Sequence, residues 1–195
     1  TGNFGDVFAG YVAAKMGLPI ERLIVATNVN DILHRALSTG DYSTGKVTPT
    51  AAPSMDIQVS SNFERLLFDL GGRDGAAMAE QMRGFEASKA MQLTNAQREG
   101  AAALFSSMRA DAGDMTKAMS WAYEKCGQII DPHTAIGLHA ARAAGIDPAI
   151  PVLFLETGKH FPETLAYRDL LTERLGLTDL RNLTPDAEAL KAKDE

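Results

Sequence analysis

Residues 1–20 read TGNFGDVFAGYVAAKMGLPI, and a short apolar run, LIVA, follows at 23–26. Apolar residues between Val7 and Met16 recur at helical spacing, and Gly17 with Pro19 ends that pattern. The apolar run is typical of a short buried strand. A glycine-rich loop, a helix and a strand in this order predict an α/β fold.

Helical patterns dominate the middle of the chain. A helix beginning at Asp31 is expected to end near Leu37, with Gly40 as its stop. The Ser-, Thr-, Gly- and Pro-rich stretch 38–56 predicts a long loop, which is more often functional or mobile than a simple connection. Further helices are expected over 61–70, 74–91, 95–110, 115–126, 132–144 and 162–175, with a charged one from Thr184. Capping signals support three of them: Ser61 with Glu64, Thr94 with Gln97, and Asp131 before Pro132.

Only one more strand is convincing, over 150–156. Two strands are too few for a self-sufficient sheet in 195 residues, so the rest of the sheet is expected to lie outside this chain. The chain also starts at Thr1 rather than at a methionine. We therefore expect it to be part of a longer protein.

Composition narrows the functional classes. The 19 Lys and Arg residues against 25 Asp and Glu residues give a net charge of −6, which argues against nucleic-acid binding. No apolar run approaches the ~20 residues of a membrane span. The single cysteine, Cys126, cannot form an internal disulfide and is compatible with a reducing cytosol. His34, His133 and His139 lack metal-ligand spacing, and the methionines from Met78 to Met119 fall on helices, so packing or solvent exposure is expected for these side chains.

The loop before the first helix has the chemistry of an anion site. Gly2 and Gly5 allow the backbone to approach a ligand closely, and the first N–H groups of a helix have no intrahelical partners. The positive end of the helix dipole favours phosphate there. The loop matches neither the P-loop nor the dinucleotide pattern. An ordinary turn in which Asp6 caps the helix is the alternative.

Four segments of the chain resemble threonine synthases, which are pyridoxal-phosphate enzymes of the tryptophan-synthase-β-like fold. Residues 1–20 resemble the segment that cradles the cofactor phosphate. LIVATNVNDIL at 23–33 is similar to the strand and helix that follow it, and PSMDIQVSSNFERLL at 53–67 and DPHTAIG at 131–137 are similar to two further signatures. Their order and approximate separation agree across residues 1–160.

The resemblance implies that residues 1–195 are the C-terminal part of the large pyridoxal-phosphate domain, a three-layer α/β/α domain of fold type II with a helix-rich middle. It implies cofactor contacts from Gly2, Asn3, Phe4 and Asp6, mainly through backbone N–H groups and the Asn3 amide. Asp6 is unusual beside a phosphate, so its carboxylate is expected to cap or orient the loop while pointing away, or to act through water. No catalytic residue is expected here, because the Schiff-base lysine of the family stands upstream of this segment.

Thr157 matches the family's threonine that hydrogen-bonds the pyridine nitrogen. The familiar Ala-Thr-Ala-His-Pro is replaced here by Glu-Thr-Gly-Lys-His at 156–160, so no roles carry over to Lys159 and His160. A strand-end threonine that bonds to its local backbone is the alternative for this position.

The activity implied by the resemblance is conversion of O-phospho-L-homoserine and water into L-threonine and phosphate, in the cytoplasm, with pyridoxal 5′-phosphate as cofactor. This chain alone is expected to be inactive and to need the missing N-terminal part of the same protein. The rival interpretations are another lyase of fold type II, such as a threonine dehydratase, and a noncatalytic module that binds a phosphate ligand. The resemblance of 53–67 to threonine synthases argues against the dehydratase.

Overall fold

The computed structural model describes residues 3–145, 152–155, 161–175 and 180–183. These residues fall into two compact units, unit 1 over Thr1–Ala144 and unit 2 over Gly145–Glu195. Unit 1 consists of α1 (Gly5–Lys15), β1 (Leu23–Thr27), α2 (Ile32–Thr39), a 3₁₀ turn (Pro53–Met55), α3 (Phe63–Leu70), α4 (Gly75–Ser88), α5 (Asn95–Ala102), β2 (Phe105–Arg109), α6 (Ala112–Cys126) and α7 (Pro132–Ala143).

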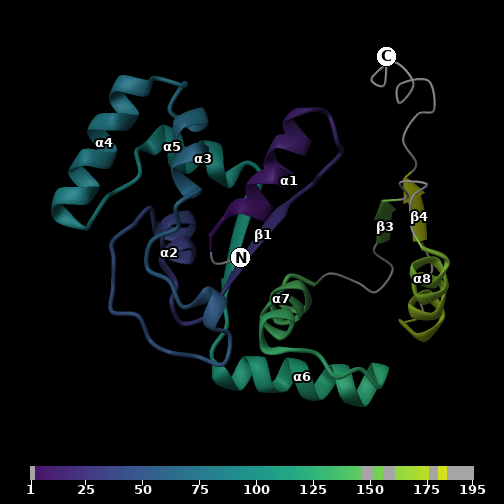
Figure 1. The fold of residues 1–195 in the computed structure, drawn as a ribbon. Helices are drawn as coiled ribbons and strands as arrows, with labels where there is room; N and C mark the ends of the chain where they lie inside the picture. The colour runs from purple at the N-terminus through teal and green to yellow at the C-terminus, as the bar shows by residue number, and fades with distance from the viewer. Residues whose placement is uncertain (1–2, 146–151, 156–160, 176–179, 184–195) are drawn as a thin grey trace. The chain divides into compact units, whose positions relative to one another are not determined.

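The sheet of unit 1 is a parallel pair. β1 and β2 lie side by side, in a register that runs from Leu23 opposite Phe105 to Thr27 opposite Arg109 (Figure 1). The predicted α/β class is therefore confirmed. Parallel strands need helices on both faces because such sheets are buried.

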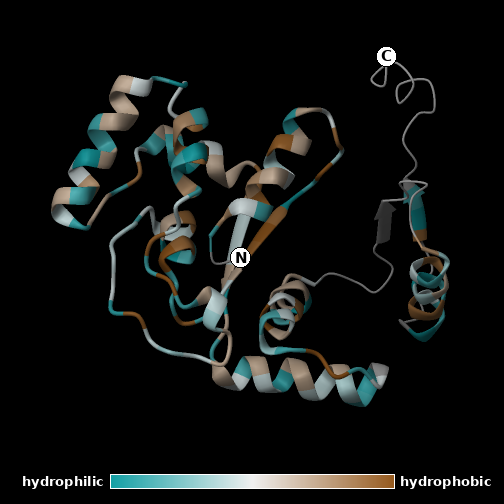
Figure 2. Ribbon diagram, viewed as in Figure 1, coloured by the Kyte–Doolittle hydropathy of each residue, from teal (hydrophilic) through white to brown (hydrophobic). Residues whose placement is uncertain are grey.

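Alternate residues of β1 enter different cores, because successive side chains of a strand point to opposite faces. Leu23 and Val25 pack in a large aromatic core with helices α1, α2 and α3, whereas Ile24 and Ala26 pack with Ile136 of α7. Figure 2 shows the hydrophobic character of β1. The sheet thus has a helical layer on each face, which is the predicted three-layer arrangement.

Aromatic rings fill the larger core. Phe4 and Phe63 meet edge to face with their centroids 5.2 Å apart, and Phe105 lies 5.7 Å from Phe4. Tyr42 stacks on Phe63 at 5.1 Å and lies 5.0 Å from Phe85. Met78 and Met82 of α4 pack around these rings, as expected for methionines on helices. Met91 packs there too, but it follows α4 and does not lie on a helix.

The prediction of one helix over 95–110 is wrong. α5 begins at the predicted Thr94–Gln97 capping box but ends at Ala102, and Phe105–Arg109 forms β2. The segment Ser106–Ser107 carries no strand pattern in the sequence. Its backbone pairs with β1, and Phe105 enters the aromatic core, so tertiary contacts decide its structure.

Of two other predicted helix caps, one is confirmed and one is wrong. Asp131 caps α7 as predicted, by accepting hydrogen bonds from the N–H groups of His133 and Thr134. The predicted Ser61–Glu64 capping box does not form, because α3 begins at Phe63 and its N-cap, Asn62, makes no side-chain cap bond. Ser61 bonds to Asn3 instead.

Unit 2 is a βαβ unit in its described residues. β3 (Val152–Leu155) pairs in parallel with β4 (Leu180–Leu183), and α8 (Pro162–Leu175) lies between them in the chain. β3 and α8 match the predicted strand and helix, while β4 was not predicted. The helix expected from Thr184 lies outside the described residues. No helix in the described part of the chain is both long and apolar enough to cross a bilayer.

We expect Phe63→Ala to lower the free energy of unfolding of unit 1 by about 3–5 kcal/mol, because it removes a ring that is 1 % exposed and touches two other rings. Phe68→Ala in the same helix is the matched control. Its ring is 37 % exposed, so a loss of about 1 kcal/mol is expected. Denaturant unfolding followed by the fluorescence of Trp121, the single tryptophan, measures both. Equal losses for the two variants would contradict this core.

Candidate functional site

The loop before α1 presents a set of backbone donors. The first helical hydrogen bond of α1 runs from the Phe8 N–H to the Phe4 carbonyl at 3.0 Å. The N–H groups of Gly5, Asp6 and Val7 come before it and have no partner within the helix. They lie at the positive end of the helix dipole. This end of α1 is therefore suited to an anion, and the anion site at this loop stays a prediction.

Phe4 takes part in this loop through its backbone alone. Its side chain is fully buried in the aromatic core. Its backbone has φ 61° and ψ 0°, in the left-handed region that a bulky residue rarely adopts. The predicted cofactor contact of Phe4 is thus restricted to its peptide groups.

Asn3 is held by the turn that precedes α3. Its Oδ1 accepts hydrogen bonds from the Ser61 N–H at 3.0 Å and from the Ser61 hydroxyl at 2.7 Å. Its backbone carbonyl accepts from Asn62 Nδ2 at 3.0 Å. We call Asn3, Ser61 and Asn62 the Asn3 clasp. No local pattern predicts this role for Ser61 or Asn62, since their bonds join residues 58 or 59 positions apart.

Asp6 lies in the first turn of α1 with an exposed side chain. The N-cap of α1 is Phe4, and no side-chain cap bond is made there, so the alternative in which Asp6 caps the helix is wrong. Two other predicted cofactor residues, Gly2 and Thr157, lie outside the described residues. Of the predicted set, the structure therefore brings together Asn3, Phe4 and Asp6.

A cavity of about 700 Å³ opens where β1 and β2 end. Ligands of parallel α/β sheets bind at this edge. Asn28 and Val29 line it after β1, Ala110 and Asp111 line it after β2, and the loop residues Thr48–Ala51 cover it. Hydrogen bonds from the N–H groups of Asp114 and Gly113 hold the pKa of the Asp111 carboxyl below its usual value.

A larger groove of about 800 Å³ lies along the carboxyl-terminal half of α1, beside α3 and α4. Its lining includes Lys15 and Met16, at the opposite end of α1 from the donor loop, and most of its surface is apolar. This groove is larger than the cavity at the strand ends. The donor N–H groups, however, belong to the first turn of α1 and not to its carboxyl-terminal half. The loop is therefore the better candidate for a phosphate.

A network of amides and one carboxylate joins the long loop 38–56 to the end of β1. Asp56 accepts hydrogen bonds from Asn28 Nδ2 at 2.7 Å, Asn30 Nδ2 at 3.0 Å and the Thr50 hydroxyl at 2.7 Å. Asn30 also donates to the Thr48 carbonyl and accepts from the Thr48 N–H. These hydrogen bonds hold the loop 38–56, which the sequence predicted to be functional or mobile, in place beside the cavity.

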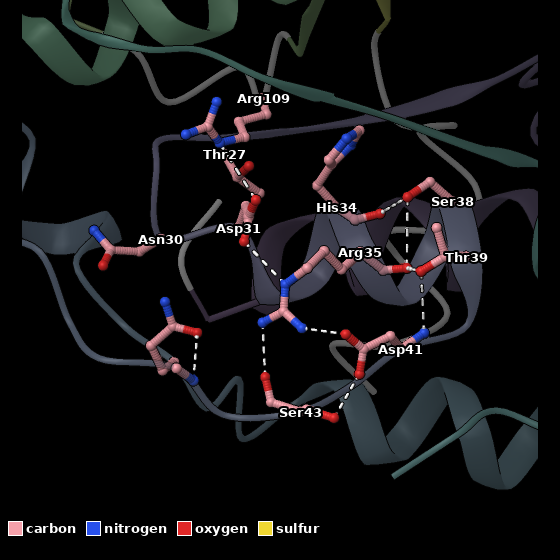
Figure 3. Close-up of polar contacts among 12 residues, drawn as sticks. Thr27, Asn30, Asp31, His34, Arg35, Ser38, Thr39, Asp41, Ser43 and Arg109 are labelled. Atoms are coloured by element: carbon pink, nitrogen blue, oxygen red, sulfur yellow. Dashed lines mark hydrogen bonds and ion pairs between the residues drawn. The ribbon is translucent and has the colours of Figure 1, made fainter. Parts of the chain in front are cut away.

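Arg35 of α2 fastens the other end of that loop (Figure 3). Its guanidinium pairs with Asp31 at 3.0 Å and Asp41 at 2.6 Å and donates to the Ser43 carbonyl at 2.7 Å. The Ser43 hydroxyl and Arg35 hold the pKa of the Asp41 carboxyl below its usual range. Arg109 reaches Asp31 from the end of β2, at 3.3 Å.

Two of the histidines have hydrogen-bond partners from distant parts of the chain. His34 Nδ1 lies 2.9 Å from the Ser107 hydroxyl, and His133 Nε2 accepts from the Ser54 N–H at 3.2 Å. Among the described residues, no group of three His, Cys, Asp or Glu side chains could hold a metal ion. The side chain of Cys126 lies outside the described set.

We expect Asp56→Asn to destabilise unit 1 by about 1–3 kcal/mol at pH 7, because it removes a charged acceptor from four donors, the Asn28 and Asn30 amides and the hydroxyl and N–H of Thr50. Burial raises the pKa of the Asp56 carboxyl, but hydrogen bonds from Thr50, Asn28 and Asn30 outweigh it, so the pKa lies below the ordinary 3.8.

A carboxyl whose pKa is lowered by folding contributes stability above its ordinary pKa and loses it as the pH falls. The difference between the unaltered chain and Asp56→Asn should therefore be complete at pH 7 and shrink as the pH falls below 3.8. Denaturant titrations at several pH values, read from Trp121 fluorescence, measure it. A difference that grows on acidification would contradict the assignment.

Known proteins with similar sequences are threonine synthases. The Pseudomonas aeruginosa threonine synthase is 47% identical over 167 residues, which cover 85% of this chain and 36% of that protein. The Saccharomyces cerevisiae threonine synthase is 39% identical over 175 residues, covering 80% of this chain and 34% of that protein. The chain thus spans about a third of the length of these relatives.

Two solved structures are also similar. The chain superposes on the pyridoxal-phosphate-bound threonine synthase of Brucella melitensis with a TM-score of 0.71 and 33% identity, covering 99% of this chain and 44% of that one. The yeast threonine synthase gives a TM-score of 0.72 and 32% identity, covering 100% of this chain and 45% of that one.

A second similarity is confined to the end of the chain. The phosphoadenosine phosphosulfate reductase domain family matches residues 133–195, which comprise most of α7 and all of unit 2. That match covers less than half of the chain, whereas the threonine synthase similarity extends over most of it. The chain therefore matches a portion of full-length threonine synthases, and it has the fold of type II pyridoxal-phosphate enzymes.

Proposed function

We propose that this chain supplies the cofactor-phosphate site of a threonine synthase. The observation that carries the proposal is the donor loop of Asn3–Gly5, in which the first-turn N–H groups of α1 and the clasped Asn3 amide lie together. Similarity to threonine synthases supports pyridoxal 5′-phosphate as the group bound, because one similar structure is named as its complex.

The donor set fits a phosphate. Oδ1 of Asn3 is occupied by the two Ser61 donors, which leaves the NH₂ group of the same amide to donate elsewhere. Backbone N–H groups at a helix start add donors of the same sign. Asp6 is exposed, so its carboxylate can remain hydrated beside the anion. When bound, the cofactor supplies an electron sink for reactions at amino-acid carbons.

The proposed reaction converts O-phospho-L-homoserine and water into L-threonine and phosphate, in the cytoplasm. The role of this chain is to anchor and orient the cofactor. We place the Schiff-base lysine in the part of the full-length protein that this chain lacks, so we expect the 195-residue chain alone to form no threonine. The threonine dehydratase and noncatalytic alternatives are less favoured, because the similar proteins are threonine synthases.

A second candidate function concerns unit 2. The similarity to the phosphoadenosine phosphosulfate reductase domain covers this unit, and the boundary between the units falls at Gly145. The familiar threonine synthase residues are also replaced at 156–160. These observations favour a unit 2 that binds a phosphosulfate nucleotide of the kind that this domain family is named after. Thr157 would then have no part in the cofactor site.

The anchoring role predicts that the chain discriminates by phosphate. Pyridoxine 5′-phosphate lacks the aldehyde and cannot attach to stray lysines, so its binding measures anchoring alone. We expect the chain to bind it at least about tenfold more tightly than pyridoxine, since hydrogen bonds to charged groups are worth about 1.5–3 kcal/mol each. Isothermal titration calorimetry measures both affinities, and inorganic phosphate should compete. Equal affinities for the two compounds would contradict the proposal.

Thr157→Ala separates the two interpretations of unit 2. If Thr157 contacts the pyridine nitrogen, its loss should weaken pyridoxine 5′-phosphate binding by about three- to tenfold, while Thr157→Ser should bind normally. Thr164→Ala, at an exposed position of α8, is the control. An unchanged affinity in Thr157→Ala, together with binding of phosphoadenosine phosphosulfate by the chain, would support the second candidate and remove Thr157 from the site.

A further inference from the structure

The Asn3 clasp determines which end of the Asn3 amide can meet a ligand. A backbone N–H can only donate a hydrogen bond, so the group of Asn3 that faces the Ser61 N–H, at 3.0 Å, must be the oxygen Oδ1. The hydroxyl of Ser61 donates to the same oxygen at 2.7 Å. The NH₂ group of the amide consequently points away from Ser61. The clasp therefore leaves two donors, and no acceptor, on the other side of this amide.

Two contacts fix the position of the Asn3 clasp relative to α1. Asn62 Nδ2 donates to the Asn3 backbone carbonyl at 3.0 Å, which fixes the peptide that follows Asn3. The next residue, Phe4, buries its ring against Phe63, the residue after Asn62. The start of α3 thus holds both the side chain and the backbone of the donor loop.

We propose that Ser61 is a positioning residue for the phosphate site: it acts through Asn3 by holding the amide with its NH₂ group toward the anion. Asn62 assists by holding the Asn3 backbone. This inference rests on the proposed function, because it assumes that a phosphate binds at the loop. Without the Ser61 hydroxyl, Oδ1 keeps only the bond from the Ser61 backbone N–H, so the amide is held less firmly and presents Oδ1, an acceptor that repels phosphate oxygens, for part of the time.

Ser60 provides a matched control beside Ser61. Its hydroxyl is buried and has no hydrogen-bond partner among the described residues, and its backbone bonds to the Tyr42 hydroxyl. Ser60→Ala therefore removes the same atom type from the neighbouring position without touching the Asn3 clasp.

Asn3→Asp separates positioning from folding. An aspartate at this position keeps an oxygen for both Ser61 donors, so the Asn3 clasp and the loop remain in place. It replaces the NH₂ group by a second carboxylate oxygen, so the donor toward the anion is lost. The added negative charge also repels an anion, so a loss in this variant shows that the Asn3 side chain lies beside the phosphate, and the Ser61 variants test whether Ser61 positions it.

The experiment measures affinity of the full chain for pyridoxine 5′-phosphate and pyridoxine by calorimetry, with thermal unfolding as a check on folding. We expect Ser61→Ala to weaken binding of the phosphorylated compound by about three- to tenfold and to leave pyridoxine affinity unchanged. Ser61→Thr should restore binding, and Ser60→Ala should leave it unchanged. Asn3→Asp should weaken it by at least about tenfold without lowering the unfolding temperature, and adding Ser61→Ala to Asn3→Asp should cause no further loss.

The results distinguish failure of the proposed function from failure of the positioning role of Ser61. If the unaltered chain does not prefer the phosphorylated compound, the proposed function is wrong and the clasp has no anion to serve. If that preference exists but Ser61→Ala keeps it in full, the proposed function stands and the positioning role of Ser61 is wrong. Additive losses in the double variant, or an equal loss in Ser60→Ala, would likewise overturn action through Asn3.

Discussion

The ring of Phe4 packs edge to face on Phe63 and lies against Phe105, so a single side chain joins the donor loop to the first residues of α3 and β2. This packing holds Phe4 in a left-handed backbone conformation that costs about 1–3 kcal/mol. Full burial of the ring is worth about 1.5–3 kcal/mol, and an aromatic pair adds about 0.5–1.5 kcal/mol. Burial therefore outweighs the strain, and the direction of the first N–H groups of α1 follows from it.

The polar network at the end of β1 and the donor loop before α1 differ in how many hydrogen-bond donors they leave without partners. Asn28, Asn30 and Asp56 bond to one another and to the loop 38–56, so most of their donors and acceptors have partners already. Their role is to close the loop over the cavity. The donor loop before α1 is different, because helix geometry leaves its N–H groups without partners and Ser61 occupies only the oxygen of Asn3. Unused donors, rather than polar residues as such, distinguish a candidate anion site.

The two units carry different weight in the functional proposal. Unit 1 contains the donor loop and the three further segments that resemble threonine synthases, and the proposed phosphate site is built from its residues. Unit 2 contains Thr157, and its sequence also matches the phosphoadenosine phosphosulfate reductase domain. Anchoring of the cofactor phosphate requires residues of unit 1 alone, so that part of the proposal does not depend on which interpretation of unit 2 is correct.

Local signals in the sequence were sufficient for several elements. The 3.6-residue period of α1, the apolar run of β1 and the caps of α5 and α7 each depend on residues close together in the chain, so they can be recognised without the fold. The glycine-rich start of the chain likewise indicated an anion-binding loop before any contact was known. Family resemblance implied the cofactor and the activity, which local patterns do not specify.

Tertiary structure decided the features that depend on distant partners. β2 became a strand because its backbone pairs with β1, although Ser106 and Ser107 have no strand pattern. Ser61 bonds to Asn3 rather than capping α3, because the buried ring of Phe4 brings the loop to it. The sequence by itself determined most of the helices and indicated the loop before α1 as a candidate for anion binding. Only the folded chain determined how the Asn3 amide is oriented, since that orientation comes from hydrogen bonds to a residue 58 positions away.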